Sequence, residues 1–121
     1  MTNHSDSEAR YEDANYASTI GRFNEAFAIY SELSQSRHVG ATVALGEMYL
    51  RGEGVTQDTQ RGLELLELAA SLGHSTAAFN LGALHRSGGY GVPIDPEKSR
   101  RFFLMAKQLG CKLPIDQYLG G

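Results

Sequence analysis

The stretch ATVALGEMYLRGEGVTQD, residues 41–58, decides the fold, because residues 77–95 repeat its pattern as AAFNLGALHRSGGYGVPID. Both copies begin with alanine, carry a Leu-Gly pair four residues later, break at glycines followed by valine, and end on aspartate. The glycines of the two Leu-Gly pairs, Gly46 and Gly82, are 36 residues apart. Self-similarity at such a period indicates a stacked array of helical units, in which each unit buries its apolar face only against its neighbours.

Each copy predicts two helices joined by a loop. In the first copy, apolar residues from Ala41 to Met48 recur at spacings of three and four, which is typical of one buried helix face. Gly52 and Gly54 end this helix, since glycine adopts a positive φ without strain. Asp58 is then placed to cap the second helix by accepting hydrogen bonds from its free amides.

The second copy repeats these steps, with Tyr90 inserted into its loop and Asp95 followed by Pro96 as the start signal of its last helix. Upstream, Gly21 opens the second helix of a degenerate first unit, whose leading helix is expected near residues 8–20. The predicted fold class is therefore all-α, a right-handed α-solenoid of three helix-turn-helix repeats with a short C-terminal cap. We expect one domain over residues 7–121, with units near 7–36, 37–73 and 74–110, a cap at 111–121 and a disordered N-terminus at 1–6.

The composition limits the classes of protein to which this chain can belong. With 121 residues, 41% hydrophobic and 21% charged, the chain resembles an ordinary soluble globular protein. No apolar run approaches the roughly 18 residues of a membrane span, no signal peptide is evident, and the single Cys111 excludes an intramolecular disulfide framework. These features favour a cytoplasmic protein. The net charge of −3 argues against nucleic acid as a partner, because a polyanion requires a broad basic face.

The charge is unevenly distributed along the chain. Residues 1–83 carry a balance of −6, whereas residues 84–121 carry +3. This polarity could steer a charged partner or orient head-to-tail self-association. Uneven but solvated helix faces without functional consequence are the alternative interpretation.

The repeated motifs resemble the SEL-one-like repeat, a relative of the tetratricopeptide repeat. Alanine, Leu-Gly, Gly-x-Gly-Val, Asp and Ala-Ala-x-x-Gly follow one another at family spacing over residues 37–110. Gly62 replaces the usual alanine, which predicts looser packing at that position. The resemblance implies an α-solenoid whose concave surface, lined by the first helix of each unit, holds peptides or protein partners in adaptor and scaffold roles.

The residue types that carry chemistry do not form a convincing active site. His38 and His74 occupy equivalent positions about one repeat apart, ~10 Å or more by helix packing distances, so they are interpreted as helix-start residues rather than metal ligands. His85 stands where the first copy has a tyrosine and is expected to pack. Cys111 has no partner that would make it a nucleophile. We therefore expect no cofactor, no metal and no catalytic residue.

The predicted function is a non-catalytic interaction module, a bacterial cytoplasmic adaptor. An immunity or antitoxin-like inhibitor of a toxin is the first alternative, and an enzyme, which would need several polar residues meeting in one pocket, is the second. The repeat pattern assigns the following residues to the concave surface: Tyr11, Asn15 and Ser18 in the first unit, Val43, Glu47, Leu50 and Arg51 in the second, and Phe79, Arg86 and Ser87 in the third.

Two features of this set predict the partner. Leu50 and Phe79 are interpreted as an exposed apolar pair, the usual makeup of a recognition surface, although Phe79 could instead pack on a neighbouring helix. Arg51 and Arg86 lie beside them in the pattern and can form charge-assisted hydrogen bonds to a carboxylate. The expected partner is therefore an acidic or amphipathic peptide segment of a protein, and neither nucleic acid nor a membrane.

Overall fold

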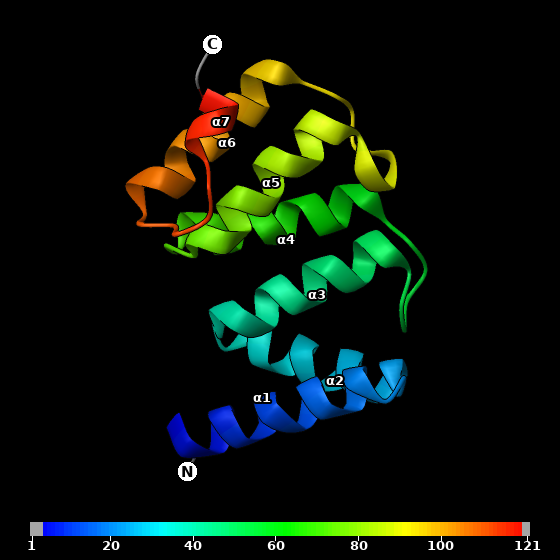
Figure 1. Ribbon diagram of the computed structural model, residues 1–121. Helices are drawn as coiled ribbons and strands as arrows, with labels where there is room; N and C mark the ends of the chain where they lie inside the picture. The colour runs from blue at the N-terminus through cyan, green and yellow to red at the C-terminus, as the bar shows by residue number, and fades with distance from the viewer. Residues whose placement is uncertain (1–3, 120–121) are drawn as a thin grey trace. The chain divides into compact units, whose positions relative to one another are not determined.

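The computed structural model describes residues 4–119, which form seven α-helices and one short 3-10 helix with no β-strand among them (Figure 1). The all-α fold class predicted from the repeat is confirmed. α1 begins inside the segment 1–6 that the sequence predicts as disordered, and residues 1–3 lie outside the described residues. The elements are α1 (His4–Thr19), α2 (Phe23–Gln35), α3 (Val39–Arg51), α4 (Thr59–Ser71), α5 (Ser75–Ser87), η1 (Gly89–Gly91), α6 (Pro96–Gln108) and α7 (Asp116–Leu119).

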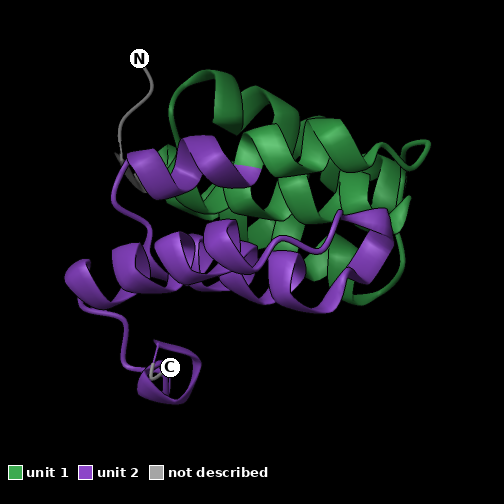
Figure 2. Cartoon of the chain, turned by 90° about the horizontal axis from the view of Figure 1, so that it is seen from above, with its two compact units in different colours: residues 1–65 green, residues 66–121 purple. Residues whose placement is uncertain are grey.

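The chain divides into two compact units, Met1–Leu65 and Leu66–Gly121, and the division falls within α4 (Figure 2). In the first unit, α2 packs against both α1 and α3. Alanines at 14, 17, 26 and 41 are buried where these helices meet, and their small side chains allow the backbones to approach closely. The larger members of this core are Tyr30, Leu33, Leu45, Met48 and Leu65.

The second unit is built on the packing of α5 against α6. Phe103 of α6 is 1% exposed, and a Cβ atom at Gly82 of α5 would lie only 2.8 Å from its ring. The Ser99 hydroxyl donates a hydrogen bond to the Gly82 carbonyl at 2.8 Å, which ties the same two helices together. The absence of a side chain at Gly82 therefore sets how closely these helices approach.

The two equivalent histidines cap helices. His38 accepts a hydrogen bond from the Ala41 amide at 3.1 Å through Nδ1, and His74 accepts one from the Ala77 amide at 3.0 Å in the same way. Each histidine is the N-cap residue of the helix that follows it, α3 and α5 respectively. The prediction that they are helix-start residues is confirmed.

The glycine stops and the aspartate caps also have the predicted positions. Gly52 and Gly88 end α3 and α5 in the left-handed conformation, with φ of +70° and +78°. Asp58 Oδ1 accepts a hydrogen bond from the amide three residues on at 3.0 Å, and Asp95 Oδ1 does the same at 3.1 Å. The amide hydrogen bond to the Asp95 carboxylate lowers the pKa of that group, as expected for a helix cap.

The residue inserted into the second loop, Tyr90, lies in η1 at a φ of +56° and is 46% exposed. The helices on either side of it, α5 and α6, each contain 13 residues, as α3 and α4 do. The extra residue is thus taken up within the loop. His85, before this loop, is 4% exposed and its ring stacks on Phe102 with centroids 5.8 Å apart, so the prediction that it packs is confirmed.

The contact between α5 and α6 generates a stability prediction. Gly82→Ala forces a methyl group into the Phe103 ring, and such overpacking costs about 1–3 kcal/mol. This exceeds the roughly 0.5–1 kcal/mol that alanine gains over glycine inside a helix. We therefore expect urea unfolding to show a less stable variant. Gly89→Ala is the control, since the nearest atom to its added Cβ lies at 3.5 Å, and equal destabilisation of both variants would contradict the packing argument.

Candidate functional site

The ten residues predicted on the concave surface come from three helices. α1 provides Tyr11, Asn15 and Ser18, and α3 provides Val43, Glu47, Leu50 and Arg51, all within the first compact unit. α5 provides Phe79, Arg86 and Ser87, within the second unit. Each group is described within its own unit.

In the first unit, a buried tyrosine brings three helices together. The hydroxyl group of Tyr30 on α2, a residue only 3% exposed, donates a hydrogen bond to Oδ1 of Asn15 on α1. The ring of Tyr11 meets the Tyr30 ring edge-on at 6.0 Å. Burial, together with the electrostatic influence of Tyr11 and of Glu47 on α3, raises the pKa of Tyr30 to about 12. We call Tyr30, its two direct contacts Asn15 and Tyr11, and Glu47, whose charge acts on Tyr30, the Tyr30 cluster.

The sequence pattern did not single out Tyr30, because it lies on the apolar stripe of α2 beside Ala26 and Leu33. A periodicity of apolar residues records which side of a helix is buried. It does not predict the hydrogen-bond partner of the hydroxyl group at the end of a tyrosine ring. Asn15, a polar residue on the neighbouring helix α1, was the available signal.

Tyr11 also takes part in the structure of the unit. Its ring lies on the His38 ring with centroids 4.5 Å apart, and His38 Nε2 is 2.9 Å from a carboxylate oxygen of Glu8. A Cβ atom at Gly40 would lie 2.8 Å from the Tyr11 hydroxyl oxygen. Tyr11 of α1 thus contacts the start of α3.

The interpretation of Leu50 as an exposed apolar residue is wrong. Leu50 is 3% exposed, and a Cβ atom at Gly62 would lie 2.7 Å from its Cγ atom. The missing side chain at Gly62 leaves a space on α4 that Leu50 fills. The looser packing predicted at Gly62 is therefore also wrong, because a neighbouring leucine replaces the volume of the usual alanine.

The remaining residues of α1 and α3 in the predicted set keep part of their surface accessible. Ser18, Val43 and Glu47 are half-buried, and Arg51 is exposed. The guanidinium of Arg51 lies 3.9 Å from the Glu47 carboxylate and 3.8 Å from that of Glu53. This part of the surface is thus polar, with its one basic side chain beside two acids.

In the second unit, two of the predicted residues of α5, Phe79 and Arg86, contact the C-terminal segment, residues 111–119. The Tyr118 ring of α7 stacks on Phe103 at 4.6 Å with an interplanar angle of 13°, and Phe79 meets both rings edge-on, at 5.3 Å from Phe103 and 6.3 Å from Tyr118. The Arg86 guanidinium carbon lies 4.9 Å from the Tyr118 ring centroid. Phe79 is thus half-buried against its neighbours, which is the alternative that the sequence left open. Ser87, at the end of α5, accepts a hydrogen bond from the Gly89 amide at 3.2 Å.

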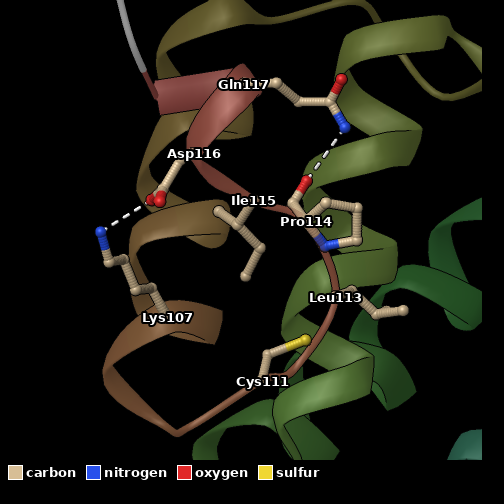
Figure 3. A pocket seen from close by; sticks show the side chains of 7 residues that line it. All are labelled: Lys107, Cys111, Leu113, Pro114, Ile115, Asp116 and Gln117. Atoms are coloured by element: carbon tan, nitrogen blue, oxygen red, sulfur yellow. Dashed lines mark hydrogen bonds and ion pairs between the residues drawn. The ribbon is translucent and has the colours of Figure 1, made fainter.

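Further contacts hold the C-terminal segment on α6 (Figure 3). Ile115 is 4% exposed and points toward the helices from the turn before α7. The Lys107 ammonium lies 2.7 Å from the Asp116 carboxylate, and the Arg100 guanidinium donates a hydrogen bond to the Leu119 carbonyl at 2.6 Å. A hollow of about 260 Å³ lies beside this segment. We call the surface formed by Phe79, Arg86, Arg100, Phe103 and Lys107 the α5–α6 face.

Among residues 4–119, no three His, Cys, Asp or Glu side chains are grouped so that they could hold a metal ion. None of the helices in this range is long and apolar enough to cross a membrane. Cys111 is a free, half-buried thiol beside the hollow of Figure 3.

The fold and these surfaces define an α-helical repeat protein. The family model described as Sel1 repeat matches residues 40–74 and 75–111, which together are more than half of the chain. The chain therefore belongs to the Sel1 repeat family, and the resemblance found in the sequence is confirmed.

Two known proteins are similar to this chain. The chitin synthase regulator SKT5 of Saccharomyces cerevisiae is 26% identical over 94 residues, which are 76% of this chain and 14% of SKT5. The crystal structure of a Sel1 repeat protein from Oxalobacter formigenes matches with a TM-score of 0.71 at 19% identity, over 87% of this chain and 44% of that one. The chain thus spans less than half the length of either protein, and the structural match supports the fold.

The Tyr30 cluster predicts a dependence of stability on alkaline pH. With the pKa raised to about 12 in the folded state, Tyr30 ionises first in the unfolded chain, so stability that is present below about pH 10 is lost as the pH rises toward 12. Tyr30→Phe removes this ionisation. We expect the wild type to lose about 1 kcal/mol more than Tyr30→Phe between about pH 9 and about pH 11, measured by urea unfolding. The exposed Tyr16→Phe is the control for loss of a phenol, and equal pH dependence of Tyr30→Phe and wild type would contradict the prediction.

Proposed function

We propose that this chain is a non-catalytic interaction module that binds an acidic, aromatic peptide segment of a protein partner on its α5–α6 face. Sel1 repeat proteins generally act as protein-interaction adaptors. The description of the yeast relative as a regulator of chitin synthase supports a role exerted on another protein. We further propose that the protein acts as an adaptor in the cytoplasm of a bacterium.

One observation carries the proposal: the chain's own C-terminal segment already lies on this face. Tyr118 of that segment is placed between Phe103 and the Arg86 guanidinium, and Asp116 pairs with Lys107. The face therefore offers an aromatic platform bordered by cations. A segment with one acidic and one aromatic side chain at similar spacing matches it, which agrees with the acidic or amphipathic ligand expected from the sequence.

The contacts that hold the segment are individually weak, so a partner can displace it. An aromatic pair contributes about 0.5–1.5 kcal/mol beyond its buried area, and an exposed cation–π contact about 0.5–1 kcal/mol. The ion pair of Lys107 and Asp116, with side chains 56% and 84% exposed, contributes at most about 1 kcal/mol. In addition, α7 has four residues, too few for a helix that is stable by itself.

The residues predicted in the first unit form a second part of the proposal. Side chains at Asn15, Val43, Glu47 and Arg51 retain accessible surface, with Tyr11 and Ser18 half-buried beside them. We propose that this surface of the first unit is a separate polar contact for a protein partner, since exposed polar groups fix register and orientation more than they add affinity. Leu50 has no part in this surface because it is buried.

A peptide added in trans tests the α5–α6 face. The full-length variant carrying Ile115→Ala and Tyr118→Ala weakens the chain's own segment, and a fluorescent peptide with the sequence of residues 112–119 serves as the probe. We expect fluorescence anisotropy to show binding to this variant and much weaker binding to the wild type, whose face is occupied. In the same background, Phe79→Ala and Arg86→Ala should each weaken binding at least several-fold.

Two controls make this titration specific. Glu64→Ala, on the exposed side of α4, should leave the affinity of the background variant unchanged. A peptide in which the tyrosine is replaced by alanine should bind about tenfold more weakly, which corresponds to roughly 1.4 kcal/mol for the lost ring contacts. If Phe79→Ala and Arg86→Ala bind the peptide as well as the background variant, the assignment of the face is wrong.

A further inference from the structure

A second surface, separate from the α5–α6 face, lies on α1 and α2 of the first unit. A hollow of about 310 Å³ there is lined by apolar side chains, two acids and Arg22. Tyr16 and Ile20 are 67% and 44% exposed, unusually high values for large apolar residues. We call this surface, formed by Asp13, Tyr16, Ile20, Glu25 and Ile29, the N-terminal face.

The N-terminal face has a definite order of side chains. Asp13, Tyr16 and Ile20 follow one another at spacings of three and four, so they lie along one stripe of α1. Glu25 of α2 adds a second acid, and Arg22 lies 3.9 Å from it. The unit to which the face belongs, residues 1–65, carries ten acidic and five basic residues, a balance of −5. The surface therefore combines exposed apolar side chains with two acids and one arginine, in a unit whose overall charge is negative.

The second unit carries a surface on α6 with two arginines, Arg100 and Arg101, and one acid, Glu97, one turn before them. Arg101, Leu104 and Gln108 follow one another at spacings of three and four, and Arg100 lies one turn before Leu104. All four side chains are exposed, with Leu104 at 44%. Residues 66–121 carry four acidic and six basic residues, a balance of +2. We call Arg100, Arg101, Leu104 and Gln108 the α6 surface.

We infer that the N-terminal face of one copy of this protein binds the α6 surface of a second copy. Leu104 would cover Tyr16 and Ile20, while the arginines beside it face Asp13 and Glu25. The opposite charge balances of the two units, −5 and +2, favour this pairing of unlike surfaces. The two surfaces differ, which makes the contact heterologous: it joins head to tail and leaves one free surface of each kind on a pair.

The contact is expected to be weak and sensitive to salt. Exposed ion pairs contribute about 1 kcal/mol or less, and raising the ionic strength from about 0.15 M to about 1 M shortens the screening length from about 8 Å to about 3 Å. Burial of the apolar residues is independent of this screening. Salt should therefore weaken the association without abolishing it.

The test uses the full-length chain and two blocking variants. Ile20→Arg closes the N-terminal face with a bulky cation, and Leu104→Glu closes the α6 surface with an acid. Both positions are exposed, so circular dichroism should show an unchanged helix content. We expect sedimentation equilibrium to show concentration-dependent association of the wild type and monomers for each variant alone.

Mixing the two variants gives the decisive measurement. Ile20→Arg retains an intact α6 surface and Leu104→Glu retains an intact N-terminal face, so an equimolar mixture should form one-to-one dimers. Leu68→Glu, which changes a leucine that is 46% exposed on α4, is the matched control and should associate like the wild type. Leu104→Ala should weaken wild-type association by about tenfold or more.

Three results would overturn the inference: a wild type that stays monomeric at every concentration, a mixture of the blocking variants that stays monomeric, or a Leu104→Glu variant that still associates by itself. The last would indicate a symmetric contact between two N-terminal faces. None of the residues changed in this test belongs to the α5–α6 face, and Arg100, which belongs to both surfaces, is left unchanged in both experiments. Failure of one proposal is thus distinguishable from failure of the other.

Discussion

The second compact unit depends on the contact between the Phe103 ring and the bare backbone of Gly82. Any Cβ atom at Gly82 would lie 2.8 Å from that ring, closer than a Cβ atom and a ring carbon pack. With no side chain there, Phe103 is fully buried between α6 and α5 and presents its other side to Tyr118. The position of the C-terminal segment, and with it the character of the α5–α6 face, follows from this one missing side chain.

In the first unit, a glycine likewise allows a large side chain to be buried against its backbone. Gly62 on α4 leaves space that Leu50 of α3 fills, and the two helices approach through a leucine instead of a phenylalanine. In both cases, the large residue is buried because its partner position is glycine. The side chain that pairs with each glycine cannot be read from the repeat, since it comes from a helix elsewhere in the chain.

Polar side chains contribute to the fold at the starts of helices and in the buried contact between α1 and α2. The helices α3 and α5 begin with histidines that accept hydrogen bonds from backbone amides, and His38 also supports the Tyr11 ring. Tyr30 is buried for most of its length and reaches Asn15 with its hydroxyl group. Among the described residues, each fully buried side-chain nitrogen or oxygen has a hydrogen-bond partner. Such satisfied groups specify the packing of the helices as well as stabilising it.

The sequence by itself determined the repeat, the helix ends and the family. These features depend on local chemistry: glycines at 52 and 88 that adopt a positive φ, aspartates that cap, and apolar residues at helical spacing. Positions in a repeat are equivalent because the local chemistry repeats, so a period of 36 residues was enough to predict them.

Only the tertiary structure decided which side chains remain accessible. Leu50 and Phe79 belong to first helices of their units, yet one fills the space at Gly62 and the other contacts Tyr118 of the C-terminal segment. Accessibility depends on what another part of the chain places opposite a residue, and neither spacing nor composition encodes that partner. The Tyr30 cluster has the same origin, since its groups come from three helices and act on Tyr30 only because α2 packs against both α1 and α3.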